Sequence, residues 1–191
     1  MAGKLHPELR IAVDDGVELR PLRLEDAELV YSIIAAERER LSEWLPWPGA
    51  IQSAPDEASF IRTSLGQLAM GEGMACAIVT NRTIAGGIGL HKADHINKST
   101  EIGYWLSEGF VGQGLVTRAT RVLTSFVFEE LGLHRVAIQA ATGNARSRAI
   151  PMRLGFVHEG TERESHLLNG ELVDLETYSM LATEWVSDGA K

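Results

Sequence analysis

The chain has 191 residues, of which 45% are hydrophobic and 23% are charged, as in ordinary globular proteins. This composition excludes a disordered, collagen-like or disulfide-scaffold protein, so we expect one domain over residues 1–191, with a core at about 17–185 and flexible termini. The net charge of −8 argues against nucleic acid as a partner. Cys76 is the only cysteine, and no apolar run is long enough for a signal peptide or a membrane span. We therefore expect a cytoplasmic protein without a membrane partner.

The N-terminal part of the chain predicts a strand followed by two helices. Residues 17–22 alternate as in a strand, and residues 25–41 carry apolar side chains at helical spacing. The residues expected along one face of this helix are Leu29, Ile33, Ala36 and Arg40. A turn rich in Trp and Pro follows at 42–49, after which Ser53 caps a second expected helix that ends near Gly71 or Gly73.

The rest of the chain predicts a mixed α+β order. Its expected elements are antiparallel strands at 74–80, 83–91 and 99–106, a helix at 114–132, a strand at 135–141, a short helix at 145–154 and strands at 156–164 and 172–182. The strand, helix and strand between 99 and 141 form a crossover, which we expect to be right-handed with parallel strands.

A glycine-containing turn joins an expected strand directly to the most regular helix, in the segment YWLSEGFVGQGLVTRAT at 104–120. Gly112 and Gly114 allow backbone N–H groups to point into one concavity, and the positive end of the helix dipole suits a pyrophosphate. A short G-x-G before a helix is also common as a simple tight turn. The loop lacks the lysine of a Walker sequence, and Thr117 replaces the third glycine of the Rossmann fingerprint, so neither nucleotide motif fits.

Several short motifs occur in a fixed order along the chain. They are WLPW at 44–47, EIGYWL at 101–106, FVGQGLVT at 110–117, LGLHR at 131–135, Asn144 with Ser147, LGF at 154–156 and LNG at 168–170. Together they resemble the GNAT superfamily of acetyl-CoA-dependent N-acyltransferases, and within it the branch of Rim-type acetylases of ribosomal-protein N-termini. The resemblance implies a GNAT-like α+β fold, with a mixed, mostly antiparallel sheet that is flanked by helices and split near its middle. It also implies acetyl-CoA as co-substrate and no metal.

The resemblance implies a coenzyme A site made mainly of backbone amides. The family writes the loop as Q/R-x-x-G-x-G/A, so Val111 and Val116 depart from the pattern at its first and last positions, and the Val116 side chain could narrow the approach of the pyrophosphate. The pantetheine arm is expected to pair with the strand before the loop. The expected cofactor-binding residues are Trp105, Leu106, Val111, Gly112, Gln113, Gly114, Leu115, Val116, Thr117, Asn144 and Ser147.

Ser147 and a backbone N–H near Leu106 are the groups that the resemblance places at the thioester. The N–H would stabilise the oxyanion, and the Ser147 hydroxyl would protonate the departing thiolate, with Asn144 hydrogen-bonded nearby. Without the resemblance, helix capping is the simpler role for Asn144 and Ser147. Pro151 removes the N–H that would bond the Ser147 carbonyl, so a bent or short helix is predicted there.

Glu101 and His166 are the two candidate bases. Strand alternation places Glu101 on the same face as Gly103 and Trp105, where it can face the cleft. His166 stands where ribosomal serine acetylases carry a carboxylate, and an imidazole keeps a basic function available there. A solvated or cross-strand paired carboxylate is the alternative for Glu101, and a histidine without a chemical role is the alternative for His166.

The expected reaction is acetyl transfer from acetyl-CoA to a primary amine by direct attack on the thioester. The first candidate acceptor is the α-amino group of a protein, ribosomal proteins included, because its reference pKa of about 8 makes it easier to deprotonate than lysine at about 10.4. The alternatives are a small amine, such as an aminoglycoside or polyamine, or a non-catalytic acyl-CoA-binding module. Trp44 and Trp47 are expected to line the acceptor groove, with core packing as their alternative. A homodimer is an expectation from the family.

Two other clusters are assigned no chemistry. His91 and His95 are four residues apart, but the residues between them favour a turn and no third ligand is apparent, so no metal site is expected. The run from Glu37 to Arg40 is expected to be a solvated helix face.

Overall fold

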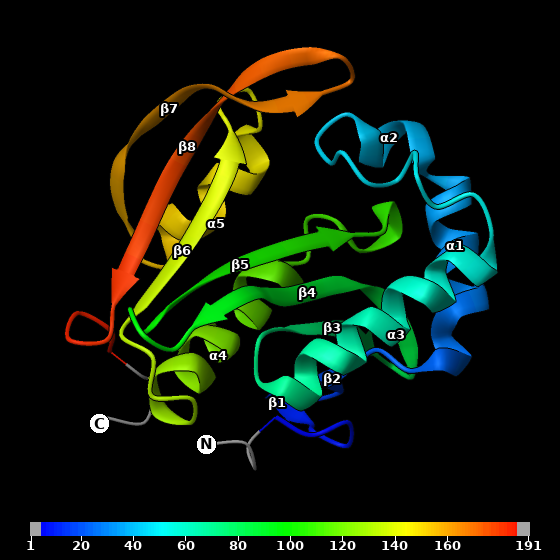
Figure 1. Ribbon diagram of the computed structural model, residues 1–191, viewed down its shortest axis with the longest axis horizontal. Helices are drawn as coiled ribbons and strands as arrows, with labels where there is room; N and C mark the ends of the chain where they lie inside the picture. Colours follow the sequence, from blue (N-terminus) through cyan, green and yellow to red (C-terminus); the bar gives the residue numbers. More distant parts are fainter. Residues whose placement is uncertain (1–4, 187–191) are drawn as a thin grey trace.

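Eight strands form one sheet in the order β1-β2-β3-β4-β5-β6-β8-β7 in the computed structural model, which describes residues 5–186 (Figure 1). The strands are β1 (Ile11–Asp14), β2 (Val17–Pro21), β3 (Met74–Thr80), β4 (Thr83–Asp94), β5 (Ser99–Leu106), β6 (Arg135–Ala141), β7 (Val157–Leu168) and β8 (Glu171–Leu181). Neighbouring strands are antiparallel except β5 and β6, which are parallel as the predicted crossover requires. The flexibility expected of the termini concerns in part residues 1–4 and 187–191, which lie outside the described residues.

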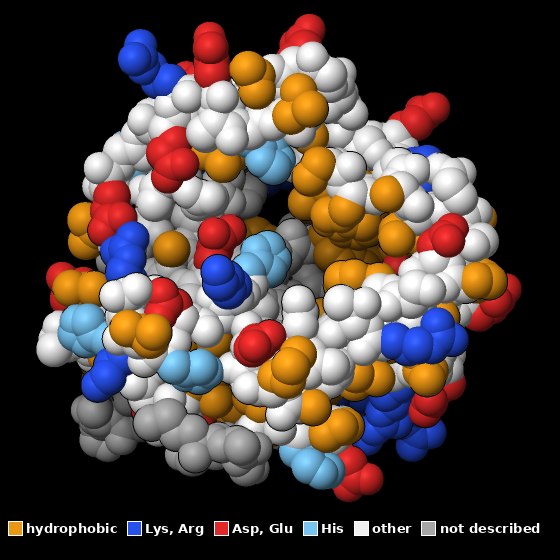
Figure 2. Space-filling model, viewed as in Figure 1, with side chains coloured by type: hydrophobic (Ala, Val, Ile, Leu, Met, Phe, Trp, Pro, Cys, Tyr) orange, Lys and Arg blue, Asp and Glu red, His pale blue; other side chains and the backbone are white. Residues whose placement is uncertain are grey.

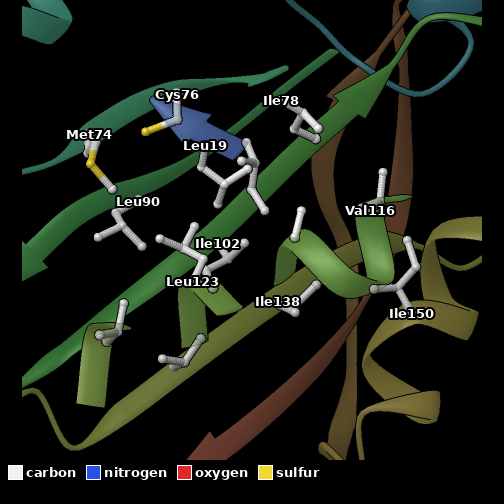
Figure 3. Packing of buried hydrophobic residues seen from close by; sticks show 14 of the residues in the cluster. Leu19, Met74, Cys76, Ile78, Leu90, Ile102, Val116, Leu123, Ile138 and Ile150 are labelled. Carbon is white, nitrogen blue, oxygen red and sulfur yellow. The ribbon is translucent and has the colours of Figure 1, made fainter. Parts of the chain in front are cut away.

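Helices cover both faces of the sheet. They are α1 (Ala27–Ala36), α2 (Arg38–Ser42), α3 (Ala54–Met70), α4 (Leu115–Glu129) and α5 (Ala145–Arg153), with the short 3-10 helices η1 (Leu24–Asp26) and η2 (Glu108–Phe110). Helices α1 to α3 share a buried apolar cluster with one face of β3 and β4, whereas α4 and α5 share another cluster with the opposite face. In that second cluster Leu123 of α4 lies beside Ile102 of β5 and Ile138 of β6 (Figure 3). The expected α+β fold with a mixed, mostly antiparallel sheet is confirmed.

Local signals set the bounds of α3 as the sequence predicts. The Ser53 side chain accepts a hydrogen bond from the Asp56 backbone N–H, and Pro55 lies in the first turn, where its missing N–H costs nothing. The helix ends at Gly71, whose φ of 73° is a left-handed conformation that glycine adopts without strain.

The helix expected over residues 25–41 is interrupted. Its first turn is η1, α1 ends at Ala36, and α2 starts at Arg38. The buried face of α1 is formed by Ala27, Val30 and Ile34, whereas Leu29 of the predicted face is 46% exposed. The predicted face was wrong because the segment carries two adjacent apolar stripes, and only packing against the sheet decides which one is buried.

Candidate active site

The sheet opens between β5 and β6. The two strands pair only at their shared end, where Ser99–Glu101 lies beside Arg135–Ala137. Beyond Glu101 the strands diverge, and β5 continues with β4 as its partner on one side (Figure 1). The backbone of Ile102–Leu106 therefore presents N–H and C=O groups to the opening, as an edge strand with which an extended ligand can pair.

The turn between β5 and α4 has the geometry of an anion site. Gly112 and Gly114 have left-handed φ angles of 83° and 71°, and Gly114 is the N-cap of α4 without a side-chain cap. The first amides of α4 lack an intrahelical acceptor, and the positive end of the helix dipole lies with them. The exposed residues of this turn are Val111, Gly112, Gln113 and Gly114, and Thr117 is half-buried. This arrangement fits the pyrophosphate of coenzyme A.

The first side chains of α4 point away from the turn. Leu115 and Val116 are 3% and 9% exposed and pack in the core, so only their backbone can face an anion. Figure 3 shows Val116 among the buried side chains. The Val116 side chain is therefore directed into the core and not into the turn. Arg118 donates a hydrogen bond to the Gln113 carbonyl oxygen (2.8 Å) and pairs with Asp14, which ties the turn to β1. The sequence did not indicate this contact, because it joins segments that are far apart in the chain.

The break between α1 and α2 places Glu37 and Arg40 against the end of β5. The Glu37 carboxylate accepts hydrogen bonds from the Ser107 hydroxyl (2.6 Å) and the Glu108 amide (3.1 Å), and it pairs with Arg40. Arg40 also donates to the Leu106 carbonyl oxygen (2.7 Å). Burial alone would raise the pKa of Glu37, but these hydrogen bonds hold it below its usual value. The expected solvated helix face is therefore wrong, since both side chains hold the start of the turn that leads to α4.

Ser147 lies on α5, across the opening from β5. The Asn144 side chain accepts a hydrogen bond from the Ser147 backbone N–H (3.0 Å), so Asn144 caps α5. Pro151 lacks the N–H that would bond the Ser147 carbonyl, and the Tyr104 hydroxyl donates to that carbonyl instead (3.2 Å). The Ser147 hydroxyl donates in turn to the Tyr104 oxygen (3.3 Å). Tyr104 thus bridges the opening and fixes the position of Ser147.

Tyr104 is a residue of the candidate site that was not predicted from the sequence. Burial raises the pKa of Tyr104 to about 12, so its hydroxyl keeps its proton at neutral pH and acts as a hydrogen-bond donor. The available signal was the carbonyl of Ser147, which Pro151 leaves without a helical partner. The sequence showed that a donor was needed but not which residue supplies it.

Glu101 and Trp105 lie on the face of β5 that carries α1 to α3. The Glu101 side chain is 37% exposed, and the Trp105 ring meets the Trp47 ring edge-on, with 6.0 Å between their centroids. Trp44 packs over Gly143 after β6, where its nearest ring carbon lies 3.3 Å from the point that a Cβ would occupy. The two tryptophans of the 42–49 turn therefore border the opening, Trp47 on the β5 side and Trp44 on the β6 side.

The β7–β8 hairpin reaches back to α2. At its tip the Asn169 amide donates a hydrogen bond to the Ser42 carbonyl oxygen (2.8 Å). His166 lies near this tip on β7 and is partly exposed, and in the described part of the chain no hydrogen bond or ion pair joins it to Glu101 or Ser147. The surface in Figure 2 is hollowed at its centre, with hydrophobic side chains along one side of the hollow.

The histidine pair considered as metal ligands is separated in the structure. His95 bonds the Gly71 carbonyl oxygen (2.7 Å), whereas His91 lies beside Glu101. Among residues 5–186, no group of three or more His, Cys, Asp or Glu is placed to hold a metal ion. No helix in the same range is long and apolar enough to cross a membrane.

A sheet that opens between two parallel strands, beside a helix whose first amides are free, can hold an extended ligand that carries phosphates. The fold and the site therefore define an acyl-CoA transferase. The chain belongs to the GNAT acetyltransferase family: residues 17–157 match the family described as "Acetyltransferase (GNAT) domain". The expected enzyme class is thereby confirmed, and the protein is an N-acetyltransferase.

Individual relatives extend over nearly the whole chain. A Bacillus subtilis (strain 168) protein named "Putative ribosomal N-acetyltransferase YdaF" is 38% identical over 91% of this chain and 95% of its own length. The ribosomal-protein-serine acetyltransferase of Escherichia coli (strain K12) is 26% identical over 90% of this chain and 96% of its own. Among solved structures, the microcin C7 self-immunity acetyltransferase MccE, in complex with acetyl-CoA and AMP, has a TM-score of 0.87 and 31% identity, covering 93% of this chain and 98% of that one.

Proposed function

We propose that this enzyme transfers the acetyl group of acetyl-CoA to the N-terminal α-amino group of a protein, with ribosomal proteins as the first candidates. The observation that carries the proposal is the opening between β5 and β6, which has Glu101 on one face of β5 and Ser147 across the gap. Two relatives named for ribosomal proteins, each aligned over at least 90% of this chain, support this acceptor. A ribosomal acceptor would also place the enzyme in the cytoplasm.

Acetyl-CoA would be held by backbone N–H and C=O groups that have no partner in a strand or helix. The edge of β5 at Trp105 and Leu106 would pair with the pantetheine arm. The amides of the 111–117 turn would bind the pyrophosphate, and the ties from Glu37 and Arg118 keep that turn in place. Acetyl-CoA supplies the activated acetyl group as a thioester.

The chemistry divides between the two faces of β5. On the face of Glu101 and Trp47, a neutral amine would approach the carbonyl carbon, and Glu101 is the basic group nearest this approach on β5. The backbone N–H near Leu106 would stabilise the oxyanion. On the other face Ser147, held by Tyr104, would give a proton to the departing thiolate. His166 remains the second candidate base.

The α-amine suits this machinery better than other amines. Its reference pKa of about 8 leaves a useful neutral fraction near pH 7.5, whereas lysine at about 10.4 needs a stronger base. The tryptophans on both sides of the opening provide apolar walls for the first residues of a peptide. The expected homodimer stays a prediction.

The test compares three acceptors that differ in the kind of amine they offer. Thiol release is measured with acetyl-CoA and one of three acceptors: a lysine-free peptide with a free α-amine, the same peptide with a blocked N-terminus and one lysine, and spermidine. The proposal predicts a kcat/KM for the free α-amine at least about tenfold above the other two. A preference for spermidine or the lysine peptide would contradict the acceptor but not the enzyme class. Binding of acetyl-CoA without thiol release from any acceptor would contradict the reaction itself.

A further inference from the structure

His91 stands beside the candidate base Glu101. The antiparallel register places His91 of β4 directly opposite Glu101 of β5, with both side chains on the same face of the sheet. The imidazole Nδ1 lies 3.6 Å from the Glu101 Oε1 atom. Catalytic hydrogen bonds are commonly this long before substrate binds and shorten in the complex. The pair is thus placed for the carboxylate to hold Nδ1–H and leave Nε2 free to accept a proton.

The missing side chain at Gly103 leaves the space that the His91 imidazole occupies. The ring atoms Cε1 and Nε2 of His91 lie 2.7 Å from the point that a Cβ of residue 103 would occupy, whereas Nδ1 lies 3.7 Å from it. Any side chain at position 103 would therefore displace the ring. Since Glu101, Gly103 and Trp105 follow one another on one face of β5, the Nε2 edge of the ring points along the strand toward the part that has separated from β6.

The surroundings of the pair are open and charged. His91 and Glu101 line a cavity of about 260 Å³ at the base of the opening, and their side chains are 64% and 37% exposed. The other charged residues that line it are Lys92 and Arg135. The Arg135 guanidinium is engaged by Glu159 at 2.6 and 2.7 Å, so it does not compete for Glu101. Water and an amine can both reach the imidazole.

We infer that His91 is the catalytic base of this enzyme, acting through Nε2, and that Glu101 is the positioning residue behind it. The inference rests on the proposed amine acetylation. As the nitrogen–carbon bond forms and the carbon–sulfur bond breaks, the proton leaving the amine nitrogen passes to Nε2. Glu101 stabilises the resulting imidazolium, which returns the proton to solvent. The thiolate takes a proton from the Ser147 hydroxyl, which regains one from solvent. The products are therefore the acetylated amine and free coenzyme A, and both side chains return to their starting protonation.

The experiment removes the His91 imidazole by mutation and tests whether imidazole added to the solution rescues the activity. In His91→Ala, kcat with the free α-amine peptide should fall about 100-fold, the usual scale of general base catalysis, while the stabilisation by acetyl-CoA in thermal unfolding is retained. Added imidazole should raise the kcat of His91→Ala at least about tenfold, because the space over Gly103 is vacant in this variant. His95→Ala, in the turn that follows β4 and outside the site, is the matched control and should keep the wild-type rate.

Gly103→Ala tests the same geometry with both side chains intact. Its Cβ displaces the imidazole, so kcat should fall while acetyl-CoA binding is retained, and imidazole should give no rescue because the new methyl group occupies the space. A Glu101→Gln variant should lose less activity than His91→Ala and should not respond to imidazole.

The outcomes separate this inference from the function on which it rests. An active wild-type enzyme with a His91→Ala variant that keeps its kcat, or that loses activity without imidazole rescue although it still binds acetyl-CoA, overturns the role of His91 alone. If the wild type acetylates only a small amine, the acceptor proposal fails and the same variants are compared with that amine. A wild type inactive on every amine overturns both.

Discussion

The Tyr104 hydroxyl and the Ser147 carbonyl oxygen are joined by a 3.2 Å hydrogen bond across the opening between β5 and α5. The bond exists because Pro151 cannot supply the N–H that a regular helix would direct at that carbonyl. A side chain of β5 thus supplies the hydrogen bond that α5 lacks. The result is a fixed distance between the edge of β5 and the hydroxyl proposed to protonate the thiolate.

Removing the Tyr104 hydroxyl should slow the reaction more than it weakens cofactor binding. In Tyr104→Phe, Ser147 loses both of its bonds to the tyrosine oxygen, so kcat should fall about tenfold, while the stability cost stays near 1 to 2 kcal/mol. Steady-state kinetics and urea unfolding measure the two effects. Tyr31→Phe, which loses a bond to the Gln52 carbonyl elsewhere, is the control and should leave kcat unchanged.

The coupling of Tyr104 to Pro151 can be measured with a double-mutant cycle. Pro151→Ala restores an N–H that competes for the Ser147 carbonyl, so Tyr104→Phe should cost less in that background than in the wild type. The four kcat values give the interaction energy, expected to exceed about 0.5 kcal/mol. Strictly additive effects would show that the proline and the tyrosine do not share the carbonyl.

Glu37 should affect the binding of acetyl-CoA although it lies between α1 and α2 and not in the 111–117 turn. In Glu37→Ala, the Ser107 hydroxyl and the Glu108 amide lose their acceptor, so the turn toward α4 loosens. We expect KM for acetyl-CoA to rise about tenfold and the free energy of unfolding to fall by about 2 kcal/mol, because hydrogen bonds to a charged group are lost. Glu39→Ala, an exposed change in the adjoining helix α2, should do neither, and equal effects of the two would refute this role.

Glu57 should make the protein less stable as the pH rises from about 4.5 to about 7. It is 3% exposed on α3, and burial raises its pKa from 4.5 to about 7. Between these values the folded protein holds a proton that the unfolded chain has released, so the stabilisation present below pH 4.5 is lost by about pH 7. Glu57→Gln should therefore be more stable than wild type by about 2 to 3 kcal/mol at pH 8 and nearly equal at pH 4.

Urea unfolding at the two pH values checks this prediction. Glu28→Gln on the exposed face of α1 provides the control and should show no such pH-dependent gain. A gain for Glu57→Gln that is the same at pH 4 and pH 8 would mean that packing, not ionisation, causes it.

The parts of the fold that were predicted correctly are encoded in continuous segments. The β5 strand, the glycine turn and α4 carry alternation, left-handed glycines and helical periodicity within residues 99–129, so no distant information was needed. The cap at Ser53 is equally local. By contrast, β1 has only four residues at the sheet edge, too few for a pattern to stand out.

The parts of the site that were missed depend on contacts between distant segments. In the sequence, Glu37 resembles any charged helical residue. Only the interruption between α1 and α2 brings its carboxylate to the Ser107 hydroxyl. His91 gains its place only through the register of β4 with β5, although a glycine inside a strand at position 103 signals a close approach of some kind. The direction of the Val116 side chain, which enters the core, also depends on packing against other elements.

Amide hydrogen exchange with and without acetyl-CoA shows which segments the ligand contacts. We expect acetyl-CoA to slow exchange in peptides that cover the β5 edge at Ile102–Leu106 and the turn at residues 111–117, whereas ATP at the same concentration does not. Protection confined to other segments, or equal protection by ATP, would contradict the assignment of the β5–β6 opening as the acetyl-CoA site.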